Sequence, residues 1–140
     1  MTDTRISISF TVAFLTLVLA AVLAIQPYSV RSRWSVYDAP GRRFLSAALR
    51  RDSVALTRLS VSSSAVGWAI RTQRDHPRAL SVWAQFARAG TGVTQSDTSR
   101  VLFDTATEVC PLLITFVGHE TQVRVLEAKA RCYLNRRDVW

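Results

Sequence analysis

The chain has 140 residues, of which 49% are hydrophobic, and a formal net charge of +8 at pH 7. Seventeen of its eighteen basic residues are arginines, and Lys129 is the exception. A charge of this sign first suggests nucleic acid, but the sequence has neither zinc-finger spacing nor an aromatic-basic RNA-binding signature. We therefore expect no nucleic-acid partner.

The stretch Ile6–Ile25 contains twenty residues without a charge. A helix of that length spans roughly 30 Å, the thickness of the hydrocarbon core of a bilayer. The sequence therefore predicts a single transmembrane helix over 6–27, after a short tail at 1–5. The alternative is a cleaved signal peptide, but the apolar run is long for one and Arg5 is offset by Asp3. We favour the retained anchor.

Positive charge follows this stretch closely. Residues 31–58 contain seven arginines and two acidic residues. Beside a membrane such charge attracts anionic headgroups, and we interpret 28–41 as an interfacial linker with aromatic anchors. The expected partners are membrane lipid and other membrane-protein subunits. The residues predicted at this interface are Tyr28, Arg31, Arg33, Trp34, Arg42, Arg43 and Trp140.

Two features of the sequence make opposite predictions about the side of the membrane on which the domain after the anchor lies. The arginines after the anchor place the following domain in the cytoplasm by the positive-inside rule. A disulfide between Cys110 and Cys132 would place it outside. We favour a bacterial cytoplasmic (inner) membrane protein with an extracytoplasmic domain and keep the cytoplasmic orientation open.

Helical periodicity marks the first half of the remaining chain. It predicts short helices over 42–51, 53–59, 65–74 and 77–88. Asp52 or Ser53 is the expected cap of the second helix. Pro77, after His76, is typical of a first helical turn.

The period then changes from helix to strand. Residues 90–98 are predicted as a flexible loop, and strands are predicted over 99–109, 112–117 and 122–132 as an antiparallel meander. This pairing brings Cys110 and Cys132 nearly opposite each other. Helices followed by an antiparallel sheet predict an α+β domain over 42–133, with a tail at 134–140.

The stretch GRRFLSAALRRDSVALTRLS resembles the opening of nuclear-transport-factor-two-like domains. In that family a first helix is followed by an acidic residue that caps a second helix, and long antiparallel strands come later. The resemblance covers roughly residues 40–133, and the chain departs from the pattern at 60–90, where two helices replace an early strand. It implies a cone-shaped fold with an apolar pocket and, for many membrane-tethered members, no catalytic activity.

Few residues indicate chemistry. His119 and Glu120 adjoin in a turn, where neighbouring side chains diverge and no third metal ligand is near. Asp104 and Glu108 share a face of the predicted strand, which favours either an acid–base pair or a solvated sheet face. We favour the solvated face and expect no catalytic residue, metal or cofactor.

We therefore predict a non-catalytic, single-span accessory subunit of a bacterial membrane complex, of respiratory or photosynthetic type, that clamps its neighbours with a basic domain. The alternative is a membrane-tethered domain that binds a small ligand. Its pocket would be lined by Val101, Phe103, Ile114 and Phe116.

Overall fold

In the computed structural model, residues 3–119 and 122–132 are described, and their contacts divide the chain into two units, 1–33 and 34–140. The first unit is nearly all one helix, α1 (Asp3–Ser35), which runs on past Pro27 into the second unit. The described side chains at 11–24 are all exposed, and the Thr16 hydroxyl donates to the carbonyls of Val12 and Ala13. The helix is predicted to end at Pro27, but it continues to Ser35. It does so although proline has no N–H to donate to the helical backbone.

The prediction of a transmembrane helix over 6–27 is wrong. In the described part of the chain, no helix is both long enough and apolar enough to cross a membrane. The described side chains of α1 are those of 11–24 and 33–35, and the apolar run 11–24 covers about 21 Å of helix. The predicted localisation as a single-pass inner-membrane protein is corrected with it.

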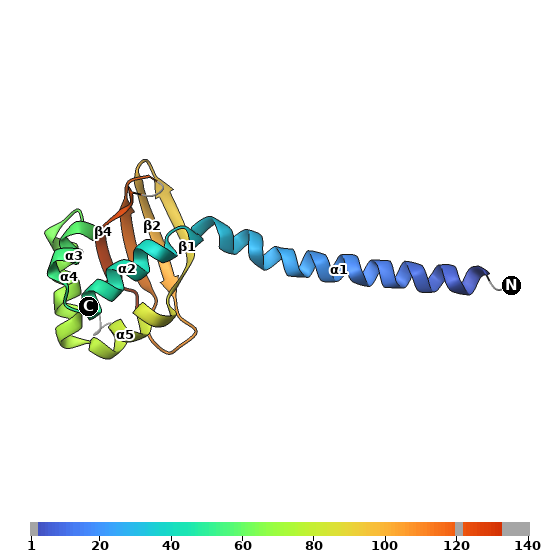
Figure 1. The fold of residues 1–140 in the computed structure, drawn as a ribbon, viewed down its shortest axis with the longest axis horizontal. Helices are drawn as coiled ribbons and strands as arrows, with labels where there is room; N and C mark the ends of the chain where they lie inside the picture. Colours follow the sequence, from blue (N-terminus) through green and yellow to red (C-terminus); the bar gives the residue numbers. More distant parts are fainter. Residues whose placement is uncertain (1–2, 120–121, 133–140) are drawn as a thin grey trace. The chain divides into compact units, whose positions relative to one another are not determined.

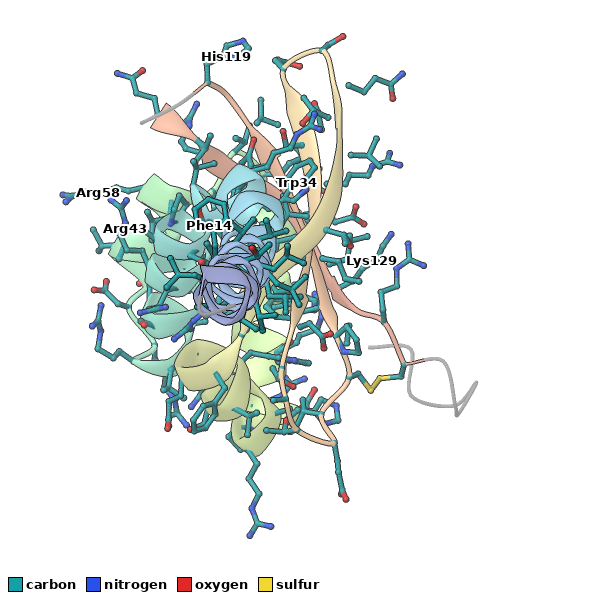
Figure 2. The ribbon with its side chains drawn as sticks, turned by 90° about the vertical axis from the view of Figure 1, so that its right-hand side faces the viewer. Phe14, Trp34, Arg43, Arg58, His119 and Lys129 are labelled. Atoms are coloured by element: carbon teal, nitrogen blue, oxygen red, sulfur yellow. A yellow bond between two sulfur atoms is a disulfide. The ribbon has the colours of Figure 1, made fainter. Side chains whose placement is uncertain are left out.

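Residues 34–132 form an α+β domain. Its helices are α2 (Asp38–Leu49), α3 (Ser53–Leu59), α4 (Ser63–Asp75) and α5 (Pro77–Phe86). Its strands are β1 (Arg88–Gln95), β2 (Thr98–Asp104), β3 (Leu112–Val117) and β4 (Arg124–Ala130). The strands pair in the order β1-β2-β3-β4, all antiparallel. Figures 1 and 2 show these four helices on one side of the sheet.

Alternation along the strands explains this two-layer arrangement. Val101, Phe103, Ile114 and Phe116 point to the helical side and are each at most 1% exposed. The helices add Phe44, Leu80 and Trp83 to the same core. Burial of such side chains stabilises the domain by about 1.5–3 kcal/mol each.

Two contacts fix the beginning of the domain to the sheet. Asp38 accepts a hydrogen bond from the backbone N–H of Ala89 at 2.7 Å. The hydroxyl of Tyr37 donates to the Ser99 hydroxyl at 2.7 Å. The region predicted as a linker, 28–41, thus contains the end of α1 and the first turn of α2, and it belongs in part to the packed domain.

The cysteines lie where β3 begins and β4 has ended. Cys110 and Cys132 form a disulfide with their Cα atoms 5.1 Å apart, visible as the yellow bond in Figure 2. The bond closes the open end of the β3–β4 hairpin, where Leu112 pairs with Ala130. The indole N–H of Trp83 donates to the Cys110 carbonyl at 2.7 Å, so α5 is held at the same place.

The predicted loop at 90–98 is instead strand β1 and its turn. Among the described strands, β1 pairs with β2 alone, and the predicted long strand 99–109 ends at Asp104. Thr105, Thr107 and the Val109 carbonyl hydrogen-bond to one another and form a compact connection. These local bonds replace the continued ladder that the alternation predicts.

Candidate functional site: a basic groove between α2 and α3

Helix α2 has two chemically different faces. Phe44, Leu45 and Ala48 are at most 1% exposed and face the core. Arg42 and Arg43 lie on the exposed side, as the helical spacing predicts. Two turns later, Arg50 immediately follows the helix, so basic side chains recur along its outer surface.

A sharp turn brings α3 back beside α2. Arg51 has a positive φ of 58°, and the carboxylate of Asp52 then accepts a hydrogen bond from the N–H of Ala55 at 3.0 Å. This is the capping interaction that begins a helix. Of the two predicted caps, Asp52 is therefore the one used, and it directs the exposed side chains of Val54 and Arg58 toward the outer surface of α2.

A groove of about 810 Å³ separates the two helices. Its arginines are Arg42, Arg43, Arg50 and Arg58, and Figure 2 shows Arg43 and Arg58 projecting on the same side of the domain. Between them lie small or apolar side chains. The remaining lining residues are Ser35, Asp38, Ala39, Ser46, Ala47, Asp52, Val54, Ala55 and Leu59.

The groove is lined by four arginines and two carboxylates, so positive charge is in excess among its described residues. In the part of the chain that the structure describes, the guanidinium groups of Arg42, Arg50 and Arg58 have no hydrogen-bond or ion-pair partner. The two groove carboxylates are already engaged, since Asp38 accepts the Ala89 N–H and Asp52 caps α3. The ion pairs found among the described residues, Arg74–Asp75 and Lys129–Glu127, lie elsewhere.

This arrangement fits a ligand that bears carboxylates. Arginine presents a planar fork of N–H donors that matches a carboxylate with two parallel hydrogen bonds. The small side chains of Ala39, Ala47 and Ala55 leave room on the floor for the ridge of another helix, because helices approach closely over small residues. The arginines at the rim of the groove can thus bind carboxylates of a ligand, and the small side chains at its centre can contact apolar surface of the same ligand.

The other predicted interface residues are not part of this groove. Arg33 is exposed in the last turn of α1, within the first unit. Trp34 is half-buried, with its ring against Gly92 and near Tyr37. The side chains of Tyr28 and Arg31 and the whole of Trp140 lie outside what the structure describes.

The four predicted pocket residues face the helices and are covered by them. Phe103 lies beneath Gly41, where a Cβ atom would be 2.6 Å from the ring. Phe116 is 6.1 Å from Phe103 between ring centroids and 5.0 Å from Tyr37. These four side chains therefore form part of the packed core of the domain.

The candidate catalytic residues are separated by the fold. Asp104 is the last residue of β2, whereas Glu108 is exposed in the connection that follows, so they do not share a strand. His119 is exposed in the turn after β3, and Glu120 lies outside the described residues. Within residues 3–119 and 122–132, no cluster of three metal-ligating side chains is found.

One perturbed carboxylate has a local cause. A hydrogen bond from Arg74 lowers the pKa of Asp75. Both side chains are well exposed at the end of α4 and lie outside the groove. The shift therefore reflects a surface ion pair, which contributes little to stability.

The sequence predicts only part of the groove. Arg42 and Arg43 are predicted at an interface, whereas Arg50 and Arg58 are not among the predicted interface residues. A signal was present, since Arg42, Ser46 and Arg50 recur every four residues and lie on one face of a helix. The position of Arg58 depends on the turn at Arg51, which the pattern of apolar residues does not determine.

Comparisons with known protein families, characterised proteins and solved structures find no match to this chain. The resemblance to nuclear-transport-factor-two-like domains therefore stays a prediction.

Proposed function

We propose that this protein is a non-catalytic accessory protein that binds an acidic helical segment of a partner protein in the groove between α2 and α3. The observation that supports the proposal is a set of three arginines, Arg42, Arg50 and Arg58, around a floor of small side chains. Their guanidinium groups have no partner among the described residues. Charge complementarity of this kind accelerates association and excludes partners of like charge.

The groove favours a protein segment over a small molecule. Its four arginines are distributed over α2, α3 and the turn between them, so a ligand must be extended to meet all of them. An amphipathic helix has this form, with carboxylates on its flanks and apolar residues at its centre. The exposed side chain of Val54, at the rim, offers the apolar contact that such a helix would cover.

The proposal can be tested with a designed peptide and the full chain. The probe is a fluorescent helical peptide with glutamates on its flanks and leucine and alanine along one face, and the control peptide has lysine at every glutamate position. We expect binding of the glutamate peptide, measured by fluorescence anisotropy, and no binding of the lysine peptide. Because the contact is ionic, its affinity should fall as salt rises.

A matched pair of variants locates the site. Arg42→Glu with Arg58→Glu reverses two charges in the groove, whereas Arg71→Glu with Arg78→Glu reverses two exposed arginines of α4 and α5 outside it. The groove variant should weaken binding by about 100-fold, at roughly 1.4 kcal/mol for each reversal, and the control by far less. Equal losses in both variants would show attraction to net charge alone and would contradict the proposal.

A further inference from the structure

The sheet has one open edge among the described residues. At the other edge, Ser60 bridges to β4 and the N–H of Val61 donates to the Val125 carbonyl at 2.8 Å. No described strand lies beside the outer side of β1, which pairs with β2 alone, although near its start the Ala89 N–H donates to the Asp38 carboxylate. An uncovered strand edge presents N–H and C=O groups to any strand that can reach it.

The tight turn after β1 shows which groups are free. Gln95 and Thr98 pair across a two-residue turn, Ser96–Asp97, and such flanking residues exchange their backbone hydrogen bonds. In an antiparallel pair every second residue exchanges backbone hydrogen bonds with the neighbouring strand, so Val93, two residues before Gln95, points its N–H and C=O toward β2. Gly92 and Thr94 point theirs outward, to the open edge.

This edge lacks the devices that usually prevent pairing between strands. Residues 89–96 include no charge and no proline. Val93 is 68% exposed on the outer face of the sheet. Natural edges are commonly protected by lysine, proline or inward-pointing charges. In a chain with a net charge of +8, this segment can meet a copy of itself without repulsion between like charges along its length.

We propose that β1 pairs antiparallel with β1 of a second copy of the chain, so that two four-stranded sheets become continuous. The pairing is centred on Val93, which then lies opposite Val93 of the second copy. Gly92 and Thr94, whose backbone groups point outward, face Thr94 and Gly92 of the copy and exchange hydrogen bonds. Such an interface is two-fold symmetric.

The charges at the two ends of the uncharged segment favour a second copy of β1, in antiparallel orientation, as the partner strand. Arg88 precedes the segment and Asp97 follows it, and both are exposed. Antiparallel pairing about Val93 brings Arg88 of one copy beside Asp97 of the other at both ends of the interface. A parallel arrangement would instead bring like charges together at each end.

Cysteine cross-linking in the full chain tests the register. The two native cysteines are joined to each other, so Val93→Cys introduces a single free thiol. Directly opposed residues that do not exchange hydrogen bonds have Cα atoms about 4.5 Å apart, within disulfide reach. Val93→Cys should therefore form a covalent dimer under mild oxidation. Gln95→Cys, which faces Thr91 of the copy, should cross-link about tenfold less.

A second pair of variants separates edge pairing from any other association. Thr94→Pro, combined with Val93→Cys, removes an outward N–H without removing a backbone hydrogen bond to β2. Thr94→Ala keeps that N–H and, like proline, removes the Thr94 hydroxyl that hydrogen-bonds to the Ser99 hydroxyl of β2. We expect the cross-link to be lost with proline and kept with alanine. Equal cross-linking of Val93→Cys and Gln95→Cys, or a cross-link that survives Thr94→Pro in the folded protein, would overturn the proposal.

Discussion

Gly41 lets α2 lie directly against the sheet. A Cβ atom at this position would be 2.6 and 2.7 Å from two ring atoms of Phe103, closer than non-bonded carbon atoms approach. Phe103 is itself 1% exposed and surrounded by core side chains, so its ring has no free space to move into. The position of α2, and with it the wall of the groove, depends on this missing side chain.

Gly41→Ala should therefore destabilise the domain by about 1–3 kcal/mol, the usual cost of overpacking a core. Urea denaturation followed by tryptophan fluorescence measures the change. Gly90→Ala is the matched control, because its nearest contact is the Leu102 carbonyl at an ordinary 3.7 Å. If both substitutions have the same effect, close packing at Gly41 is not what positions α2.

Asp52 has two opposed roles in the groove. Its carboxylate caps α3 through the Ala55 N–H, and it also contributes negative charge among the arginines. The first role stabilises the fold, whereas the second weakens attraction for an acidic ligand.

Asp52→Ala should consequently lower the free energy of unfolding by about 1 kcal/mol. At the same time it should raise the affinity for the glutamate peptide about threefold, since a repulsive charge is removed. Asp104→Ala removes the same charge outside the groove and should change neither quantity to this extent. Reduced affinity of Asp52→Ala in the folded protein would show that the carboxylate supports binding.

At the scale of elements, the sequence predicted those with a strong period. The strand predicted at 112–117 is found with these bounds because it is a short, nearly continuous apolar run. The helix predicted at 42–51 is found as Asp38–Leu49 because its apolar residues repeat with the helical period, although it begins four residues earlier. Strand β1 was missed because Gly90, Gly92 and Thr94 are typical of a loop. Its formation depends on pairing with β2 and on Trp34 packing against Gly92, which are contacts distant in sequence.

The end of α1 illustrates the same limit. Pro27 indicates the end of a helix, but the structure continues α1 to Ser35. Tyr37 and Asp38 then contact Ser99 and Ala89, about sixty and fifty residues away in the chain. Local sequence contains no information on such distant partners, so a region predicted as a linker lies partly inside the domain.

At the scale of the whole molecule, the α+β class follows from the order of the patterns. Helical periodicity comes first and alternation second, and the structure has helices on one side of an antiparallel sheet. The transmembrane assignment followed from an uncharged run alone and is wrong. Only Arg42 and Arg43 of the four groove arginines were predicted at an interface. The groove as a whole depends on α2 and α3 lying side by side, which the sequence pattern does not predict.

The whole molecule combines two binding features in this account. The groove between α2 and α3 attracts an acidic partner, and the β1 edge pairs with a second copy. They lie on different elements and can be tested independently, since Arg58→Glu does not alter β1 and Thr94→Pro does not alter α2 or α3.

The most direct test of the groove is a double-mutant cycle between Arg58 and individual glutamates of the peptide. Dissociation constants are measured for the native chain and Arg58→Ala, each with the native peptide and with single Glu→Ala peptides. For one glutamate we predict a coupling energy of about 1 kcal/mol, a fivefold non-additivity, because a charge pair is formed. Strict additivity at every glutamate position would contradict the account, since it would mean that Arg58 contacts no carboxylate of the bound helix.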